Sequence, residues 1–333
     1  MRHIGVFVLL IVQIWAKKED PECKMNTPQI IEHWGYPSQT EHVTTEDGYI
    51  LELHRIPFGK NNMNPNRPVI FMQHGLECSS SNWIANLPTE SAGFLFADAG
   101  FDVWLGNMRG NTYSTNHVSL KPKHDAFWKW TWDEMSKHDL DAMINYVLNV
   151  TGQPSLYYMG HSQGTLTMFA KLSQEPEFSQ KIKKFFALAP IGSVKHIKGM
   201  LKFLADNFSI EVDAWFDVFG AGEFLPNNII MKTVATAVCG GLKIENDLCD
   251  NMLFLIAGPE SNQMNTTRVP VYLTHTPAGT SSMNIQHWLQ MVKKGTVAMY
   301  DRGKKDNLKV YGQVLKRLQK FVNLVLYCLI CVV

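Results

Sequence analysis

A serine flanked by two glycines is the clearest chemical signal in this sequence. The stretch Gly160-His161-Ser162-Gln163-Gly164 fits the pattern G-x-S-x-G, in which a strand passes into a helix through a strained turn. That turn exposes the serine hydroxyl, and only glycine fits where the strand and the helix crowd each other. The N–H groups that begin the helix favour a developing negative charge. Ser162 is therefore predicted to be the nucleophile of an acyl-transfer reaction, with Gly160 and Gly164 as the glycines of the turn.

A second loop is predicted to stabilise the charge that forms on the substrate oxygen. His74-Gly75-Leu76 follows the apolar run RPVIFMQ. In this architecture such a loop supplies one backbone N–H of the oxyanion hole, and the residue after the nucleophile supplies the other. We therefore predict Leu76 and Gln163 as the two donors. For His74, a structural hydrogen-bonding role is favoured over a catalytic one.

The elements around these residues predict a parallel sheet covered by helices. EHVTTEDGYILELHRIPF alternates around Asp47-Gly48, as a β-hairpin with a positive-φ turn does. Strands that are apolar throughout and alternate with helices indicate a parallel sheet covered on both faces. The expected strands are RPVIFMQ, 101–105, 156–159 and IKKFFALAP, and the expected helices are WDEMSKHDLDAMINYVLNV, ended by Gly152, and SQGTLTMFAKLSQ.

Composition narrows the possible classes of protein. Of the 333 residues, 45% are hydrophobic and 18% are charged, which supports a substantial core and argues against disorder. The 31 basic and 30 acidic residues nearly cancel, and no basic run is interleaved with aromatics. A nucleic-acid partner is therefore not expected.

The N-terminus predicts entry into the secretory pathway. Residues 1–16, MRHIGVFVLLIVQIWA, read as a signal peptide with a short positive start and an apolar run. A membrane anchor is the weaker alternative, because a span needs about 20 apolar residues; no transmembrane span is expected. Sequons at Asn149, Asn207 and Asn265 are candidate glycosylation sites. The expected location is lysosomal or extracellular.

Six cysteines are present, and an oxidising compartment would permit disulfides. Cys239 and Cys249 are close in sequence and could bridge. Cys328 and Cys331 form a Cys-x-x-Cys pair in an apolar tail. Without a second pair of ligands this is weak evidence for a metal site, and no metal is predicted.

The alternation of strands and helices stops beyond Pro190. Residues 17–190 are predicted to form the α/β core with its N-terminal hairpin, and residues 191–300 an inserted, mostly helical subdomain. Its apolar groups, such as AWFDVF and NMLFLIAG, fit either an ordinary core of its own or a cap over an apolar pocket. Residues 301–333 are expected to return briefly to the core and end in an apolar tail.

Long stretches of the chain resemble the acid lipase family, which includes gastric lipase and lysosomal acid lipase. The resemblance runs from about residue 20 to Gln313. It implies an α/β-hydrolase fold with a cap beginning near Pro190. It also implies hydrolysis of neutral lipid esters, triacylglycerols or steryl esters, at a lipid–water interface without a cofactor, and a cap disulfide between Cys239 and Cys249. The matching stretches include MNTPQIIEHWGYPSQTEHVTTEDGYILELHRIPFGK, FMQHGLECSSSNWIANLP, FADAGFDVWLGNMRGNTYS, FWKWTWDEMSKHDL, YYMGHSQGT, FFALAP, VYLTHTPAGTSSMNIQHW and YDRGKKDNLKVYGQ.

The resemblance ends at VLKRLQKFVNLVLYCLICVV. The family places its catalytic Asp after the cap and its catalytic His near the C-terminus. We therefore expect two strand–helix units, the last strands of the sheet and both triad partners to be missing from this chain. The tail could lie at a membrane surface, but translation of an alternative exon or an intron is the favoured explanation.

Other residues could in principle replace the missing partners of Ser162. His275 and His287 lie in cap sequence that active relatives share, so they are expected to be structural. Neither Asp250 nor Asp301 belongs to the family's acid motif. The histidines that follow Ser162 are His196, His275 and His287.

Three hypotheses follow for the chain. The first is a lipase-like hydrolase of neutral lipid carboxyl esters. The second is a non-catalytic lipid-binding or regulatory form, in which the cleft is kept and hydrolysis is lost. The third is a chain that does not fold stably, because loss of the last strands would leave one edge of the sheet open and core surface uncovered.

Overall fold

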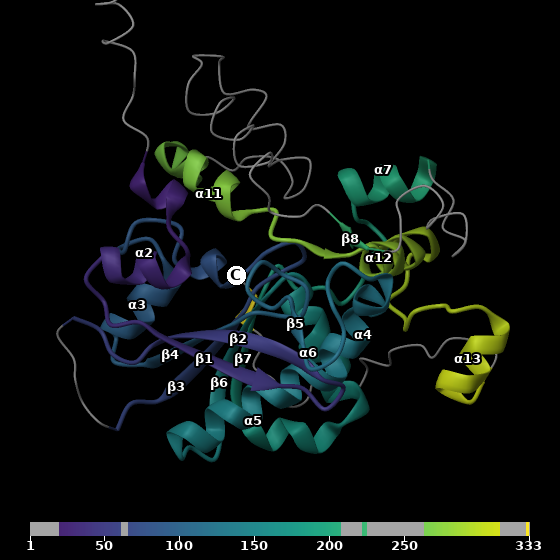
Figure 1. The fold of residues 1–333 in the computed structure, drawn as a ribbon, viewed down its shortest axis with the longest axis horizontal. Coiled ribbons are helices and arrows are strands. Elements are labelled where there is room, and N and C mark those ends of the chain that lie inside the picture. Colours follow the sequence, from purple (N-terminus) through teal and green to yellow (C-terminus); the bar gives the residue numbers. More distant parts are fainter. Residues whose placement is uncertain (1–19, 61–65, 208–221, 225–262, 314–330, 333) are drawn as a thin grey trace, which may run out of the picture.

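The structure is a computed structural model that describes residues 20–60, 66–207, 222–224, 263–313 and 331–332. The strands follow the order β1-β2-β4-β3-β6-β7-β10 across one sheet, and β5 pairs with β2. From β4 to β10 neighbouring strands are parallel, whereas β2 is antiparallel to its partners. The predicted α/β fold with a mostly parallel sheet is confirmed (Figure 1). The strands are β1 (Gln39–Thr44), β2 (Tyr49–Ile56), β3 (Val69–Gln73), β4 (Asp102–Gly106), β5 (Asn116–His117), β6 (Leu156–His161), β7 (Ile182–Leu188) and β10 (Cys331–Val332).

Helices cover both faces of this sheet, and a two-stranded sheet stands apart from it. The second sheet pairs β8 (Glu223–Phe224) with β9 (Thr280–Ser281). The short 3-10 helices are η1 (Pro21–Lys24), η2 (Ser80–Trp83), η3 (Asp125–Trp128), η5 (Pro176–Lys181) and η6 (Thr266–Arg268). The α-helices are α2 (Thr27–His33), α3 (Ala92–Asp98), α4 (Trp132–Glu134), α5 (Leu140–Thr151), α6 (Gln163–Gln174), α7 (Met200–Asn207), α11 (Val269–His275), α12 (Ser282–Lys294) and α13 (Lys304–Tyr311).

The alternation of side chains along β3 divides the hydrophobic core in two. Val69 and Phe71 join the cluster packed against α5 and α6. Ile70 and Met72 point the other way, into the cluster packed against α2 and α3. All four side chains are buried. Both faces of the strand are therefore apolar, which explains its uninterrupted hydrophobic sequence.

The predicted hairpin is present, whereas the helix predicted to start at Trp132 is interrupted. β1 and β2 pair antiparallel as expected, and Gly48 adopts a φ of 95° at the turn. The helix expected from Trp132 to the stop at Gly152 is instead interrupted by a π-helical turn, η4 (Met135–Asp139). The wide turn lets Asp139 accept hydrogen bonds from the Arg109 side chain and backbone, at 2.7 and 3.0 Å.

Described segments between 191 and 313 pack onto the α/β core. Val194, Ala205, Ile285 and Trp288 belong to the same buried cluster as residues of β3, α5 and α6. Helices α7 and α12 lie together at one end of the molecule (Figure 1). These segments thus extend the hydrophobic cluster on the α5–α6 face of the sheet.

The edge of the sheet beside β7 carries a short strand from the apolar tail. Cys331 and Val332 pair in parallel with Phe186 and Ala187. The sequence predicts an open edge where the last strands of the sheet are missing; in the structure these two residues pair along part of β7. The predicted signal peptide, the Cys239–Cys249 pair and Cys328 lie outside the described residues. Within the part that the structure describes, no helix is long and apolar enough to cross a membrane.

Candidate active site

Strained backbone gathers at the carboxyl ends of three neighbouring strands. Among the described residues other than glycine, positive φ occurs at Glu77, Ser162 and Ala189, with values of 56°, 50° and 47°. They follow β3, β6 and β7, which are adjacent in the sheet. The carboxyl ends of parallel strands are where α/β folds bind ligands. Strain at these positions costs free energy and is typical of functional sites.

Ser162 lies in the strained strand-to-helix turn that the sequence predicts. Its backbone has φ 50° and ψ −115°, and it stands between β6 and the first residue of α6. The Ser162 N–H donates to the Leu188 carbonyl at 3.0 Å, which ties the turn to β7. Ser162 is partly exposed, whereas the next residue is buried. The serine therefore stands at the surface end of a buried strand–helix junction.

Glycine is required on both sides of the serine. A Cβ at Gly160 would lie 2.8 Å from the backbone of Gly164. A Cβ at Gly164 would lie 2.5 Å from the Gln73 carbonyl oxygen and 2.8 Å from that of His74. Real Cβ atoms do not approach backbone atoms so closely. The two glycines let α6 begin directly against the end of β3.

The loop after β3 reaches the same point. A Cβ on Gly75 would lie 3.1 Å from the Cβ of Ser162. Within the described part of the chain, neither the Leu76 nor the Gln163 backbone N–H has a hydrogen-bond acceptor. Two unpaired amides beside a serine hydroxyl are what an oxyanion hole needs. Leu76 and Gln163 remain our predicted donors.

His74 supports this loop through hydrogen bonds. Its Nδ1–H donates to the Gly75 carbonyl at 2.8 Å. Its Nε2 accepts from the Met108 N–H at 3.1 Å and lies 3.2 Å from the Asn111 amide nitrogen. Burial lowers the pKa of His74 to about 4, so the ring is neutral at ordinary pH. These contacts are those of a structural histidine.

The side chain of Gln163 is held by two hydrogen bonds from α12. Its Oε1 accepts from Trp288 Nε1 at 2.7 Å and from Asn284 Nδ2 at 3.0 Å. Both donors lie on α12, and all three residues are buried. Two hydrogen bonds to one oxygen hold the first turn of α6, so they also orient the Gln163 amide.

No described histidine hydrogen-bonds the Ser162 hydroxyl. His275 Nε2 lies 3.1 Å from the Glu22 carbonyl oxygen, and His287 Nε2 lies 2.8 Å from that of Ala298. His287 also stacks on the ring of Trp132. His196 is exposed, in the segment after β7. His275 and His287 are thus engaged by the backbone carbonyls of Glu22 and Ala298 rather than by Ser162.

The remaining predicted residues lie away from the serine or outside the described chain. Asp301 accepts from Asn307 Nδ2 at 2.8 Å, which makes it part of a local turn. Asp250 is not among the described residues. The sequon residues Asn149 and Asn207 are exposed, and Asn265 is partly exposed. No cluster suited to hold a metal ion occurs within the described ranges.

Sequence reasoning missed the partners that hold the site from a distance. Ala278 N–H donates to the Glu77 carbonyl at 2.7 Å, and Trp288 anchors Gln163. These contacts join residues more than a hundred positions apart, so no local pattern could reveal them.

Two family models match this chain. The first, described as a partial alpha/beta-hydrolase lipase region, matches residues 27–87. The second, described as the alpha/beta hydrolase fold, matches residues 68–290. Together they cover the loop after β3 and the turn at Ser162.

Three proteins similar to this chain are named lipases. Lipase lipl-1 of Caenorhabditis elegans is 67% identical over 304 residues, which is 90% of this chain and 75% of that protein. Human lysosomal acid lipase/cholesteryl ester hydrolase is 45% identical over 315 residues, 91% of this chain and 77% of that protein. Human gastric triacylglycerol lipase is 46% identical over 285 residues, which is 85% of this chain and 71% of that protein.

A solved structure supports the fold independently. The crystal structure of a Sulfolobus solfataricus protein matches with a TM-score of 0.53 at 15% identity, covering 73% of this chain and 72% of that one. At this identity the likeness concerns the fold alone. The family models and the identity to named lipases show that the chain belongs to the acid lipase group of the α/β-hydrolase family, which makes it an ester hydrolase by family.

Proposed function

We propose that this protein hydrolyses carboxyl esters of neutral lipids, triacylglycerols or steryl esters, with Ser162 as nucleophile. The observation that carries the proposal is the strained turn at Ser162, which is followed by the Gln163 amide and approached by the loop that carries Leu76. Neither amide has a hydrogen-bond acceptor among the described residues. The names of two relatives support the substrate class, since one is a cholesteryl ester hydrolase and another a triacylglycerol lipase. Substrate would be met at a lipid–water interface, and the chemistry needs no cofactor.

The reaction runs through an acyl-enzyme. Ser162 Oγ gives its proton to a base and attacks the acyl carbonyl carbon, while the Leu76 and Gln163 amides bind the oxyanion. The tetrahedral intermediate collapses, the ester C–O bond breaks, and the alcohol leaves with a proton returned by the base. Water then attacks the acyl-enzyme by the same route, releasing the fatty acid and restoring the hydroxyl.

The base is the missing part of this site among the described residues. A serine without a positioned base is a poor nucleophile at neutral pH. The contacts of His74, His275 and His287 with backbone carbonyls favour a second candidate function, that of a non-catalytic lipid-binding or regulatory protein. On that proposal the triad Asp and His are absent, and the site binds esters without cleaving them.

The relatives' names also support a place in the secretory pathway, since one is a lysosomal and another a gastric lipase. We propose that residues 1–16 are a signal peptide, that Cys239 and Cys249 form a disulfide, and that Asn149, Asn207 and Asn265 accept glycans. We also propose that residues 191–300 act as the cap over the acyl pocket. Mass determination of the mature protein from its natural source tests the first three together.

The catalytic proposal is tested with the purified chain, its Ser162→Ala variant and a matched control, Ser193→Ala, which changes an exposed serine after β7. Hydrolysis of emulsified triacylglycerol and cholesteryl ester and labelling by a fluorophosphonate are measured. Turnover and labelling that only Ser162→Ala abolishes support the enzyme. Saturable binding of a long-chain ester without either signal favours the binding protein instead.

A further inference from the structure

The residue after Leu76 is a glutamate that accepts hydrogen bonds through both its backbone and its side chain. Glu77 has a φ of 56°, a strained value for a side chain of this size. Its carbonyl accepts from the Ala278 N–H at 2.7 Å, and its Oε2 accepts from the Gly279 N–H at 3.2 Å. The segment before β9 therefore clamps both the backbone and the side chain of the residue next to a predicted oxyanion donor.

The other carboxyl oxygen of Glu77 has no partner in the part of the chain that the structure describes. Oε1 is buried, and no hydrogen-bond donor reaches it among the described residues, although the residue as a whole is only partly buried. An ionised carboxylate would leave charge on this atom without compensation. A protonated carboxyl would keep the Gly279 bond to Oε2 and leave a neutral group at Oε1. The surroundings thus favour the neutral acid.

The neighbouring groups add no positive charge. Glu223 of β8 lies on the other side of Gly279, where its Oε1 would be 2.7 Å from a Cβ at that glycine. Glu223 is exposed and acts on Glu77 as a like charge, partly screened by solvent. The Cys78 thiol is next in the chain, and burial together with Glu77 raises its pKa to about 12, so it stays neutral. No described Lys, Arg or His acts on the Glu77 carboxyl.

Burial, with a smaller contribution from Glu223, raises the pKa of Glu77 well above its ordinary value. Its folded-state pKa lies above its unfolded-state pKa. The stability it contributes is therefore complete below the unfolded value and is lost as pH rises through the folded value. Ionisation would drive the carboxyl toward water and disturb the clamp.

We propose that Glu77 is a positioning residue that, as a neutral acid, holds the oxyanion loop His74–Glu77 in place. The proposal rests on the proposed function insofar as Leu76 is an oxyanion donor. Ionisation leaves charge on the buried Oε1 of Glu77 and adds repulsion from Glu223. These two costs outweigh the stronger bond that a carboxylate would accept from the Gly279 N–H. The carboxyl is therefore drawn toward water, which breaks the clamp and frees Leu76 to move. The site is thereby better formed at acidic than at neutral pH.

Hydrogen exchange tests the proposal without requiring activity. The variant Glu77→Gln keeps an acceptor for Gly279 and cannot ionise, and Glu177→Gln is a matched exposed control. Exchange of peptides covering 74–79 is compared at pH 5 and pH 7.5. At pH 7.5 we expect Glu77→Gln to exchange roughly tenfold more slowly than the wild type, a factor that corresponds to about 1.4 kcal/mol of lost clamp stability. At pH 5 the two should match, and the control should follow the wild type.

Equal exchange of Glu77→Gln and wild type at pH 7.5 would overturn the proposal. Glu223→Gln provides a second variant should Glu77→Gln fail to fold. At pH 7.5 residues 74–79 of Glu223→Gln should exchange more slowly than those of the wild type, by a smaller factor than in Glu77→Gln. Equal exchange of Glu223→Gln and the wild type would also count against the proposal. The fluorophosphonate labelling rate gives the functional readout, and its ratio of Glu77→Gln to wild type should rise from pH 5 to pH 7.5. If neither protein is labelled, the proposed catalytic function fails for this chain, while the exchange result still decides the role of Glu77.

Discussion

Gln163 and Trp288 are joined by a 2.7 Å hydrogen bond between Oε1 and Nε1, although 125 positions separate them. Gln163 begins α6 directly after Ser162, and Trp288 lies in the middle of α12. Both side chains are buried. A helix that follows the α/β core in sequence therefore fixes the residue whose amide is predicted to bind the oxyanion.

The bond from Trp288 should make a measurable contribution to stability. Trp288→Phe keeps an aromatic ring and removes the donor, leaving Asn284 as the remaining donor to Gln163 Oε1. Trp83→Phe is the matched control, since Trp83 is also buried but its Nε1 has no partner in the described chain. In chemical denaturation Trp288→Phe should cost about 1 kcal/mol more than the control. Equal losses would mean that the hydrogen bond adds nothing.

The crowding at Gly164 predicts that substituting this glycine destabilises the protein more than Trp288→Phe does. A Cβ there would meet the Gln73 carbonyl oxygen at 2.5 Å. Because backbone must shift to admit it, Gly164→Ala should destabilise the protein by about 1–3 kcal/mol and disturb the turn at Ser162. Gly192→Ala is the control, since nothing lies within 4 Å of its Cβ position, and it should change stability by less than about 0.5 kcal/mol. A fully stable Gly164→Ala protein would contradict the packing described here.

Local sequence signals were sufficient for the hairpin, the buried strands and the turn at Ser162. Each depends on a short-range rule: alternation, an apolar run, or glycines two residues from a serine. The π-helical turn was not predicted, although Met135 and Leu140 are five positions apart where α-helical spacing would be three or four. The clamp on Glu77 and the anchor on Gln163 depend on contacts with residues 278–288, and only the folded chain reveals them.

Asp133 predicts a decline of stability toward alkaline pH. Burial, reinforced by the charge of Glu134, raises its pKa to about 8, although the Tyr300 N–H and Arg302 oppose the shift. Its Oδ2 accepts from the Tyr300 N–H at 2.9 Å, and its Oδ1 has no partner in the described part of the chain. The folded-state pKa exceeds the unfolded one, so the stability from this group is complete below about pH 4 and is lost as pH rises through about 8.

Asp133→Asn should remove that decline, because the amide keeps the acceptor for Tyr300 and carries no charge. The melting temperature of the variant relative to the wild type should therefore rise between pH 5 and pH 8. Asp125→Asn changes an exposed aspartate and should track the wild type throughout. A constant difference between Asp133→Asn and the wild type over this range would show that Asp133 stays ionised when folded.

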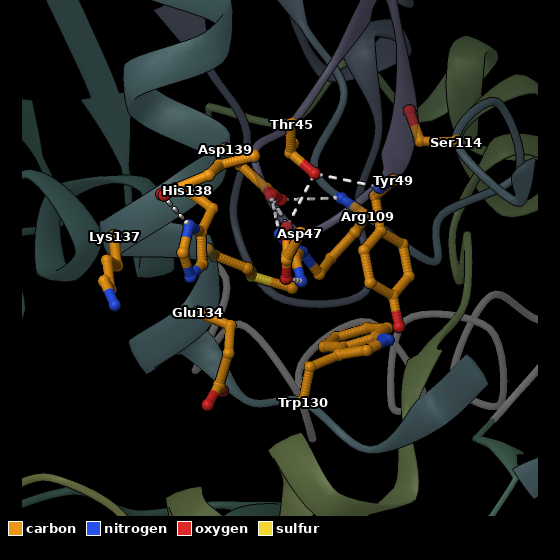
Figure 2. Close-up of polar contacts among 12 residues, drawn as sticks. Thr45, Asp47, Tyr49, Arg109, Ser114, Trp130, Glu134, Lys137, His138 and Asp139 are labelled. Carbon is orange, nitrogen blue, oxygen red and sulfur yellow. Dashed lines mark hydrogen bonds and ion pairs between the residues drawn. The ribbon is translucent and has the colours of Figure 1, made fainter. Parts of the chain in front are cut away.

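Arg109 is a fully buried cation, and its two carboxylate partners should contribute unequally to stability. Figure 2 shows its guanidinium between Asp47 and Asp139, with Tyr49 against it. The side chains of Arg109 and Asp139 are 0% exposed, whereas that of Asp47 is 31% exposed. Asp139→Asn leaves a buried charge short of its buried partner, and should cost about 3–5 kcal/mol.

Asp47→Asn should cost less, because solvent already screens that pair. Burial alone would raise the pKa of Asp47, but Arg109 overrides it and lowers the pKa to about 2. The stability from Asp47 is therefore present above about pH 4 and is lost as pH falls through about 2.

Urea denaturation at pH 7 should give Asp139→Asn a smaller free energy of unfolding than Asp47→Asn. Asp206→Asn, which breaks only the exposed pair with Lys202, should change stability least. The reverse order of the first two would mean that the hairpin turn, not the π-helical turn, holds Arg109.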